Sequence, residues 1–250
     1  MISIQLLFLS SLIIGLLGII QFITINKIKI KKNQSHKVSS LVIDGIKIYG
    51  LRSFSSILQI LTYTSLILYI FCIILNKTFL WNQIGSFFLG GLSMSITLFI
   101  LTGIIPTFIP KILEKSKGYF NQSIIIHFNT VSMLGFISIS ILLLIGIILF
   151  YLTSYKLLIG YGLGIIFSSF FTRIGGGLFK TSSHISLGIS KLRSPELPSE
   201  DVRNTGYLVN ISADYTHKLS GFCSDIIGTF FLSILSMILF AFAFEKHTIL

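Results

Sequence analysis

Long apolar segments alternate with shorter polar ones along the whole chain. Crossing the hydrocarbon core of a bilayer as a helix takes about 20 mostly apolar residues. Backbone polar groups in lipid must be satisfied within their own segment, so each such segment is expected to be helical. Six segments qualify, at about residues 3–25, 55–76, 84–106, 129–153, 157–179 and 222–243. The pattern predicts an all-α integral membrane bundle of six transmembrane helices, forming a single domain over residues 1–250.

The first apolar run also invites comparison with a secretory signal peptide. Its length exceeds the 7–15 apolar residues usual in such peptides, and no cleavage site of small residues follows it. We therefore interpret residues 3–25 as a retained transmembrane helix.

Basic residues gather on one side of this predicted topology. The connections after the first, third and fifth helices carry fifteen lysines and arginines, whereas the opposite side has three. The positive-inside rule then places both termini outside the cytoplasm and a long polar loop, at about 180–221, inside it. Topology and contact with anionic lipid headgroups account for the net charge of +11, so no nucleic-acid partner is expected.

The segment from Arg173 to Asp225 departs furthest from the lipid-like pattern. Five of the eight acidic residues lie in it. They are Glu196, Glu200, Asp201, Asp214 and Asp225. Arg173 falls near the end of an apolar helix, where it either extends to the interface or pairs with a carboxylate such as Asp225. Glycines 175–177, together with those at 160, 162 and 164, favour close helix packing over a ligand cradle.

Residue patterns of common soluble chemistries do not occur in the sequence. Cys72 and Cys223 lie within apolar segments and are interpreted as small buried side chains. The five histidines form no pair at helical ligand spacing, and no phosphate-binding P-loop, nucleophile elbow or dinucleotide fingerprint is present.

Six regions of the chain resemble, in the same order, motifs of the membrane-bound, ion-pumping pyrophosphatases. The fifth helix and its following loop in that family are similar to GYGLGIIFSSFFTRIGGGLFKTSSHISLGISKL. The next two family motifs resemble LPSEDVRN and NISADYTHKLSGFCSDIIGT. The segment before their second helix resembles LVIDGIKIYGLRSF, their third helix resembles FFLGGLSMSI, and the entry to their fourth helix resembles HFNTVSMLGF. The resemblance implies the N-terminal six-helix portion of a pump that has about sixteen helices in the family.

The resemblance also implies a chemistry and a set of site residues. In the family, Mg²⁺ ions held by carboxylates bind pyrophosphate together with lysines, and hydrolysis drives proton or sodium transfer. Carried over by motif position, the catalytic residues are Lys180 and Asp214, and the substrate-binding residues are Lys180 and Lys191. The Mg²⁺ ligands are Asp201 and Asp214, and the residues of the ion path are Arg173 and Asp225.

Several other motif positions differ from the family pattern. Aspartates of the family are replaced at His184, Gly188, Asn210 and Lys218, the motif lysine falls at Thr181 and the gate glutamate at Gly228. A glycine offers no oxygen ligand to a hard cation, and a lysine repels it. Three functions therefore stay open. The chain is a shortened or split pump subunit, completed by a companion membrane subunit or a homo-oligomer; a non-catalytic membrane scaffold; or a small ion transporter or channel.

Overall fold

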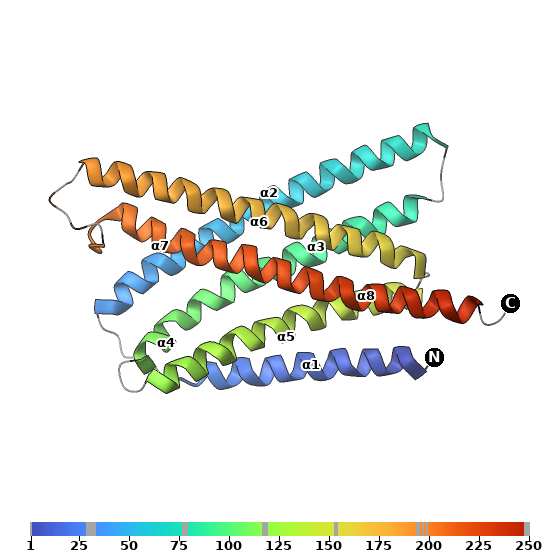
Figure 1. Cartoon of the computed structure of the whole chain (residues 1–250), viewed down its shortest axis with the longest axis horizontal. Helices are drawn as coiled ribbons and strands as arrows, with labels where there is room; N and C mark the ends of the chain where they lie inside the picture. Colours follow the sequence, from blue (N-terminus) through green and yellow to red (C-terminus); the bar gives the residue numbers. More distant parts are fainter. Residues whose placement is uncertain are drawn as a thin grey trace.

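The computed structural model describes residues 2–28, 34–76, 80–116, 120–152, 155–193, 196, 198 and 200–247, and helices account for nearly all of them (Figure 1). In chain order these are α1 (Ile2–Asn26), α2 (Gln34–Ile74), α3 (Trp81–Ile104), the 3₁₀ turn η2 (Ile105–Phe108), α4 (Ile109–Ser116), α5 (Phe120–Leu152), α6 (Tyr155–Arg193), α7 (Thr205–His217), the π-helical turn η3 (Lys218–Cys223) and α8 (Ser224–His247). Six helical stretches of this part of the chain are long and apolar enough to cross a membrane. The prediction of an all-α membrane bundle is confirmed.

The polar segment differs from its prediction, because most of the expected loop at 180–221 is helical. Helix α6 continues without a break to Arg193, and α7 and η3 fill residues 205–223. Helix α2 likewise begins at Gln34, well before the expected boundary at 55. Hydropathy marks only the part of a helix that contacts lipid, so a polar extension outside the bilayer leaves no apolar signal.

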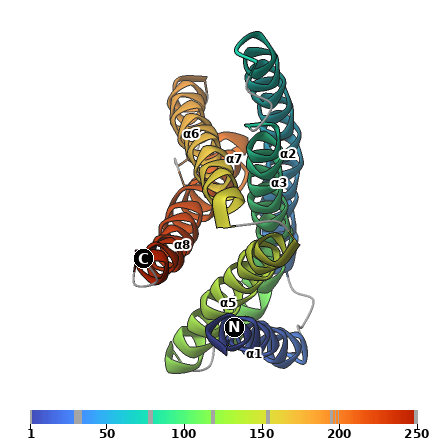
Figure 2. The same ribbon diagram turned by 90° about the vertical axis from the view of Figure 1, so that its right-hand side faces the viewer.

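Helix α3 lies at the centre of the bundle. Its candidate span is 56% buried, whereas that of α1 is 11% buried. Figure 2 shows α1 and α5 side by side, set off from α2, α3 and α6, and α1 packs mainly on α5. The outer helices thus turn large apolar side chains outward, as expected of surfaces that contact lipid.

Helices α3 and α6 approach closely through glycine. A Cβ atom added at Gly90 would lie 2.0 Å from the carbonyl oxygen of Tyr161, and one at Gly164 would lie 2.0 Å from that of Phe87. Ser168 adds a hydrogen bond from its hydroxyl to the carbonyl of Gly91, at 2.8 Å. Small residues and such hydrogen bonds are typical of helix contacts in membranes. The predicted role in close packing is confirmed for Gly160, Gly162 and Gly164, where an added Cβ would lie within 2.5 Å of another helix, but not for Gly177, where it would meet open space. The contact with α3 fixes α6 in place.

The two ends of the bundle hold different helix termini. The start of α1 and the end of α8 lie at one end, and the end of α6 and the start of α7 lie at the other (Figure 1). This arrangement agrees with six crossings. Which end faces the cytoplasm stays a prediction.

Candidate functional site

One face of α6 carries three basic residues in a row. Lys180 follows Arg173 by seven residues and Lys191 follows Lys180 by eleven, intervals that return to nearly the same side of a helix with 3.6 residues per turn. At 1.5 Å per residue, the steps are about 10 Å and about 16 Å along the axis. Gly177 lies on the same face, and a Cβ added there would meet open space.

Helix α7 is fastened to the last turns of α6 by two asparagines. Asn204 caps α7, and its side-chain oxygen accepts hydrogen bonds from the Gly206 amide at 3.0 Å and from the Ser190 hydroxyl of α6 at 2.7 Å. Further along, Ser183 of α6 donates to the side chain of Asn210 at 3.2 Å. An N-cap residue satisfies an otherwise unpaired backbone donor. These bonds hold the acidic residues of α7 beside the basic face of α6.

Asp214 binds two lysines at once. Its Oδ1 atom lies 2.7 Å from Nζ of Lys180 on α6, and its Oδ2 atom lies 2.7 Å from Nζ of Lys218, one turn further along its own helix. All three side chains are partly exposed. The group carries a net charge of +1, because one carboxylate faces two ammonium groups. Lys218 stands at a motif position where an aspartate was expected, and its pairing with Asp214 follows a common helical signal, an acid and a base four residues apart.

Arg173 and Asp225 contact each other, which is one of the two alternatives that the sequence leaves open for Arg173. The Nη1 atom of Arg173 donates a hydrogen bond to Oδ2 of Asp225, joining α6 to the first turn of α8. Their exposed fractions, 61% and 33%, show that neither charge is covered by the rest of the chain. Close to this pair, Gly176 packs on η3, where an added Cβ would lie 2.1 Å from the Ser220 hydroxyl.

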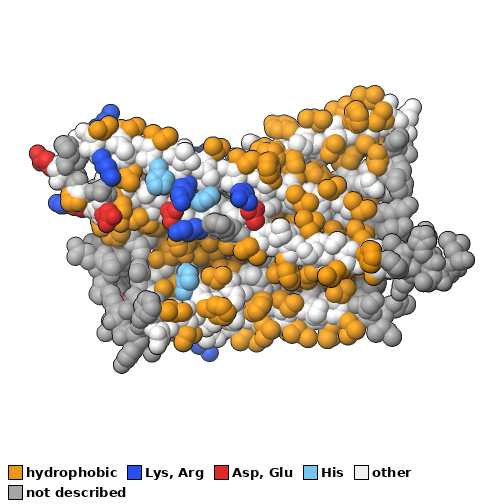
Figure 3. Space-filling model, viewed as in Figure 1, with side chains coloured by type: hydrophobic (Ala, Val, Ile, Leu, Met, Phe, Trp, Pro, Cys, Tyr) orange, Lys and Arg blue, Asp and Glu red, His pale blue; other side chains and the backbone are white. Residues whose placement is uncertain are grey.

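We call Arg173, Lys180, Asp214, Lys218 and Asp225 the polar stripe. Charged side chains gather over α6, α7 and the start of α8 on a face that is otherwise largely apolar (Figure 3). The stripe is open to the outside of the described chain. It brings together four of the six predicted site residues.

The remaining two predicted residues lie apart from the stripe. Asp201 precedes α7 and is bound by Arg203, whose Nη2 atom lies 2.7 Å from its Oδ2 atom. Hydrogen bonds from this side chain and from its backbone lower the pKa of Asp201 to about 2. Lys191 lies three turns beyond Lys180 on α6, so the two lysines do not contact one and the same phosphate group.

Both predicted Mg²⁺ ligands are bound by cations of the chain itself. Asp201 is bound by Arg203, and Asp214 is bound by Lys180 and Lys218. Asp225 follows Asp214 by eleven residues, about 16 Å along the helix axis. Among the residues that the structure describes, no three His, Cys, Asp or Glu side chains come together as a metal site. This donor set does not fit a magnesium-pyrophosphate site within the chain.

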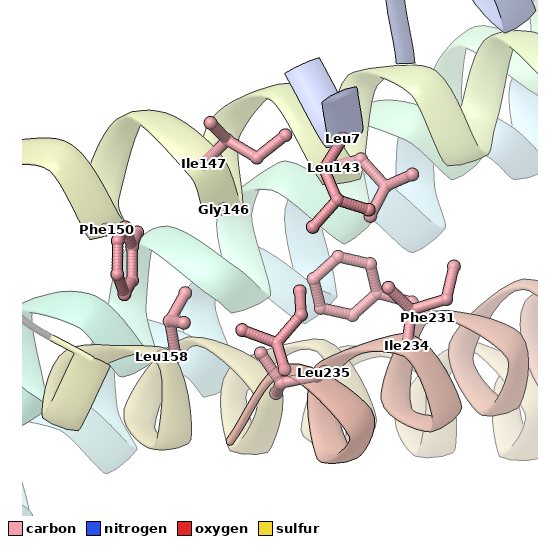
Figure 4. Close-up of a pocket in the computed structure, with 10 residues that line it drawn as sticks. Leu7, Leu143, Gly146, Ile147, Phe150, Leu158, Phe231, Ile234 and Leu235 are labelled. Carbon is pink, nitrogen blue, oxygen red and sulfur yellow. The ribbon is translucent and has the colours of Figure 1, made fainter. Parts of the chain in front are cut away.

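A small cavity lies away from the polar stripe, and no polar or charged side chain lines it. It is enclosed by apolar side chains of α1, α5, α6 and α8, among them Leu7, Leu143 and Phe231 (Figure 4). Its volume is ≈ 30 Å³. An apolar void of this size stays dry and binds nothing by hydrogen bonds.

Six long apolar helices, with ion pairs that join α6 to α7 and α8, define a multi-pass α-helical membrane protein. The family model described as inorganic H⁺ pyrophosphatase matches residues 12–250, and the chain belongs to that family. A comparison with curated proteins gave no significant match.

Proposed function

We propose that this chain is a membrane subunit of the pyrophosphatase family that does not hydrolyse pyrophosphate by itself. The part of its polar stripe formed by Arg173 and Asp225 contacts helices of a companion membrane subunit. Family membership supports the assignment to the pyrophosphatase family. The binding of the carboxylates by lysines and arginines supports the lack of hydrolysis, and the exposed charges support the companion subunit.

The observation that carries the proposal is the pairing of Asp214. Both of its oxygens lie 2.7 Å from a lysine ammonium. A Mg²⁺ ion at this carboxylate would have to displace at least one lysine and would then lie close to two positive charges. Lys218 stands where the family motif has an aspartate, so this position repels the cation that the family site attracts. Asp201 and Asp225 are each bound by an arginine of the chain.

A companion subunit is favoured by the exposed charges. Arg173 lies about 10 Å along α6 from Lys180, toward the apolar part of the helix. A charged side chain at the bilayer centre costs about 2.5–3.5 kcal/mol when it faces lipid. Intramembrane charges accordingly face protein or water in folded membrane proteins. The Arg173–Asp225 end of the polar stripe is therefore the side of the chain on which other helices pack.

Photo-crosslinking in native membranes tests this contact directly. A photoreactive amino acid at Gly177 lies on the stripe, where the structure has room for it. The matched control is the next residue, Leu178, which has the same depth but turns toward another side and is 65% exposed. We expect a polypeptide adduct from position 177 and a lipid adduct from position 178. Lipid adducts from both positions would contradict the companion subunit.

A further inference from the structure

A groove with one polar end runs between α5 and the α7–α8 pair. Its volume is ≈ 400 Å³, within the range of about 300–1,000 Å³ that is usual for ligand sites. Apolar residues form most of its walls: Leu101 and Ile105 at its base, Leu134 on α5, and Ile226 and Ile227 on α8. Figure 1 shows α5 and α7 spreading apart toward the end of the bundle where α7 begins. The groove lies along this widening.

The polar residues of the groove lie at its wider end. His127 enters from an early turn of α5 and Lys218 from the start of η3. Gly135 lies further along α5, and Ile227 lies beyond η3 on α8. The Lys218 side chain is 62% exposed and uses one contact, at 2.7 Å, on Asp214. An ammonium group has three donors, so it keeps donors for another acceptor. The group formed with Lys180 and Asp214 has a net charge of +1, which favours an anion.

We propose that this groove binds an anionic phospholipid. Its phosphate lies against Lys218 and His127, and one acyl chain lies along the apolar walls toward Gly135. The groove has the same polarity as a lipid, with a cation at one end and mainly apolar side chains beyond it. Its polar end is also the one that the basic residues predict to be cytoplasmic, where anionic lipids are abundant. The site does not depend on whether the chain hydrolyses pyrophosphate.

Glycine positions allow the groove to be filled without disturbing the fold. Nothing lies within 4 Å of a Cβ added at Gly135, which lines the groove. The same is true at Gly103 on α3, which does not line it. Gly135→Phe therefore places a ring in the path of the acyl chain, and Gly103→Phe is the matched control. Lys218→Gln removes the charge and leaves the groove open.

The test is lipid retention by the full chain, reconstituted in vesicles of equal phosphatidylcholine and phosphatidylglycerol, extracted mildly and measured by native mass spectrometry. We expect one retained lipid per chain, with a roughly fivefold preference for phosphatidylglycerol, because one lysine is attracted to its net negative charge and phosphatidylcholine has none. Lys218→Gln should retain a lipid without preference, Gly135→Phe should retain none, and Gly103→Phe should match the unaltered chain. Equal retention in the two phenylalanine variants, or an unchanged preference in Lys218→Gln, would overturn the proposal.

Alkylation of Cys223 gives a second readout that does not rely on retention. This cysteine lines the groove, and Cys72, which is buried elsewhere, can be replaced by serine in the test background. We expect added phosphatidylglycerol to slow maleimide reaction at Cys223 more than phosphatidylcholine does. Crosslinking of Cys223 to a helix of another polypeptide, with no lipid effect, would instead assign the groove to a protein partner.

Discussion

The contact between α3 and α6 predicts opposite effects for two glycine-to-alanine changes on one helix. At Gly164, the new methyl group would lie 2.0 Å from the carbonyl oxygen of Phe87 and 2.7 Å from the amide nitrogen of Gly91. Both obstructing atoms belong to the backbone, so no side chain can rotate away. At Gly177 the methyl group would meet open space.

The size of the effect follows from how far the helices must part. Real Cβ contacts are essentially never shorter than 3.0 Å, so the two helices must separate by about 1 Å at Gly164. A gap of 0.5–1 Å forfeits about a quarter to a half of each van der Waals contact along the seam. Overpacking usually costs about 1–3 kcal/mol. We expect Gly164→Ala to lower the free energy of unfolding by about 3 kcal/mol. Gly177→Ala should raise it by about 0.5–1 kcal/mol through helix propensity.

Equilibrium unfolding of the purified variants in mixed detergent micelles, followed by circular dichroism, measures both changes. Each variant is compared with the unaltered chain at the same detergent composition. A stability of Gly164→Ala equal to that of Gly177→Ala would refute the packing of α6 on α3, and with it the position of the polar stripe.

Three further predictions concern the charged residues. Arg173→Gln and Asp225→Asn should show a coupling of about 0.6–1.7 kcal/mol in a double-mutant cycle of unfolding, whereas additive effects would mean that the pair does not form in the membrane. Because the folded pKa of Asp201 is depressed to about 2, its pairing stabilises the fold above about pH 4 and is lost as the pH falls toward 2. Arg203→Gln should raise this pKa part of the way toward about 3.9, because the amide of residue 203 still donates to the carboxylate; a pKa unchanged by carboxyl carbon NMR would argue against the ion pair. Lys218→Asp should create Mn²⁺ binding detectable by electron paramagnetic resonance, and equal Mn²⁺ binding by the unaltered chain would contradict the role given to this lysine.

Much of the fold could be predicted from the sequence because lipid imposes strong rules. Long apolar segments fix the number of crossings, and the requirement to satisfy backbone groups makes them helical. The extension of α6 to Arg193 could not be predicted in this way, since a polar helix outside the bilayer resembles a loop in hydropathy. Glycine spacing predicts that helices pack closely, but it does not predict that α3 and α6 meet at Gly90 and Gly164. Which helices meet depends on the assembled bundle.

The candidate site could be predicted only in part. Pairing of Arg173 with Asp225 follows from the cost of lone charges in a membrane and is present in the structure. Motif positions alone assign Asp201 and Asp214 as Mg²⁺ ligands. In the structure Asp201 is bound by Arg203 and Asp214 by Lys180 and Lys218, and these partners are decided by the backbone conformation. The second lysine on Asp214 could be predicted from its spacing, because Lys218 lies one helical turn from Asp214. The family motif gives no such indication, since it has an aspartate at this position.

Pyrophosphate hydrolysis by the purified chain, reconstituted alone in liposomes with excess Mg²⁺, tests the central claim most directly. Binding of both Asp214 oxygens by lysines predicts no release of phosphate above that of empty liposomes. Mg²⁺-dependent hydrolysis that disappears in Asp214→Asn would contradict the account, because it would show that this carboxylate exchanges its lysines for metal and that the chain is catalytic on its own.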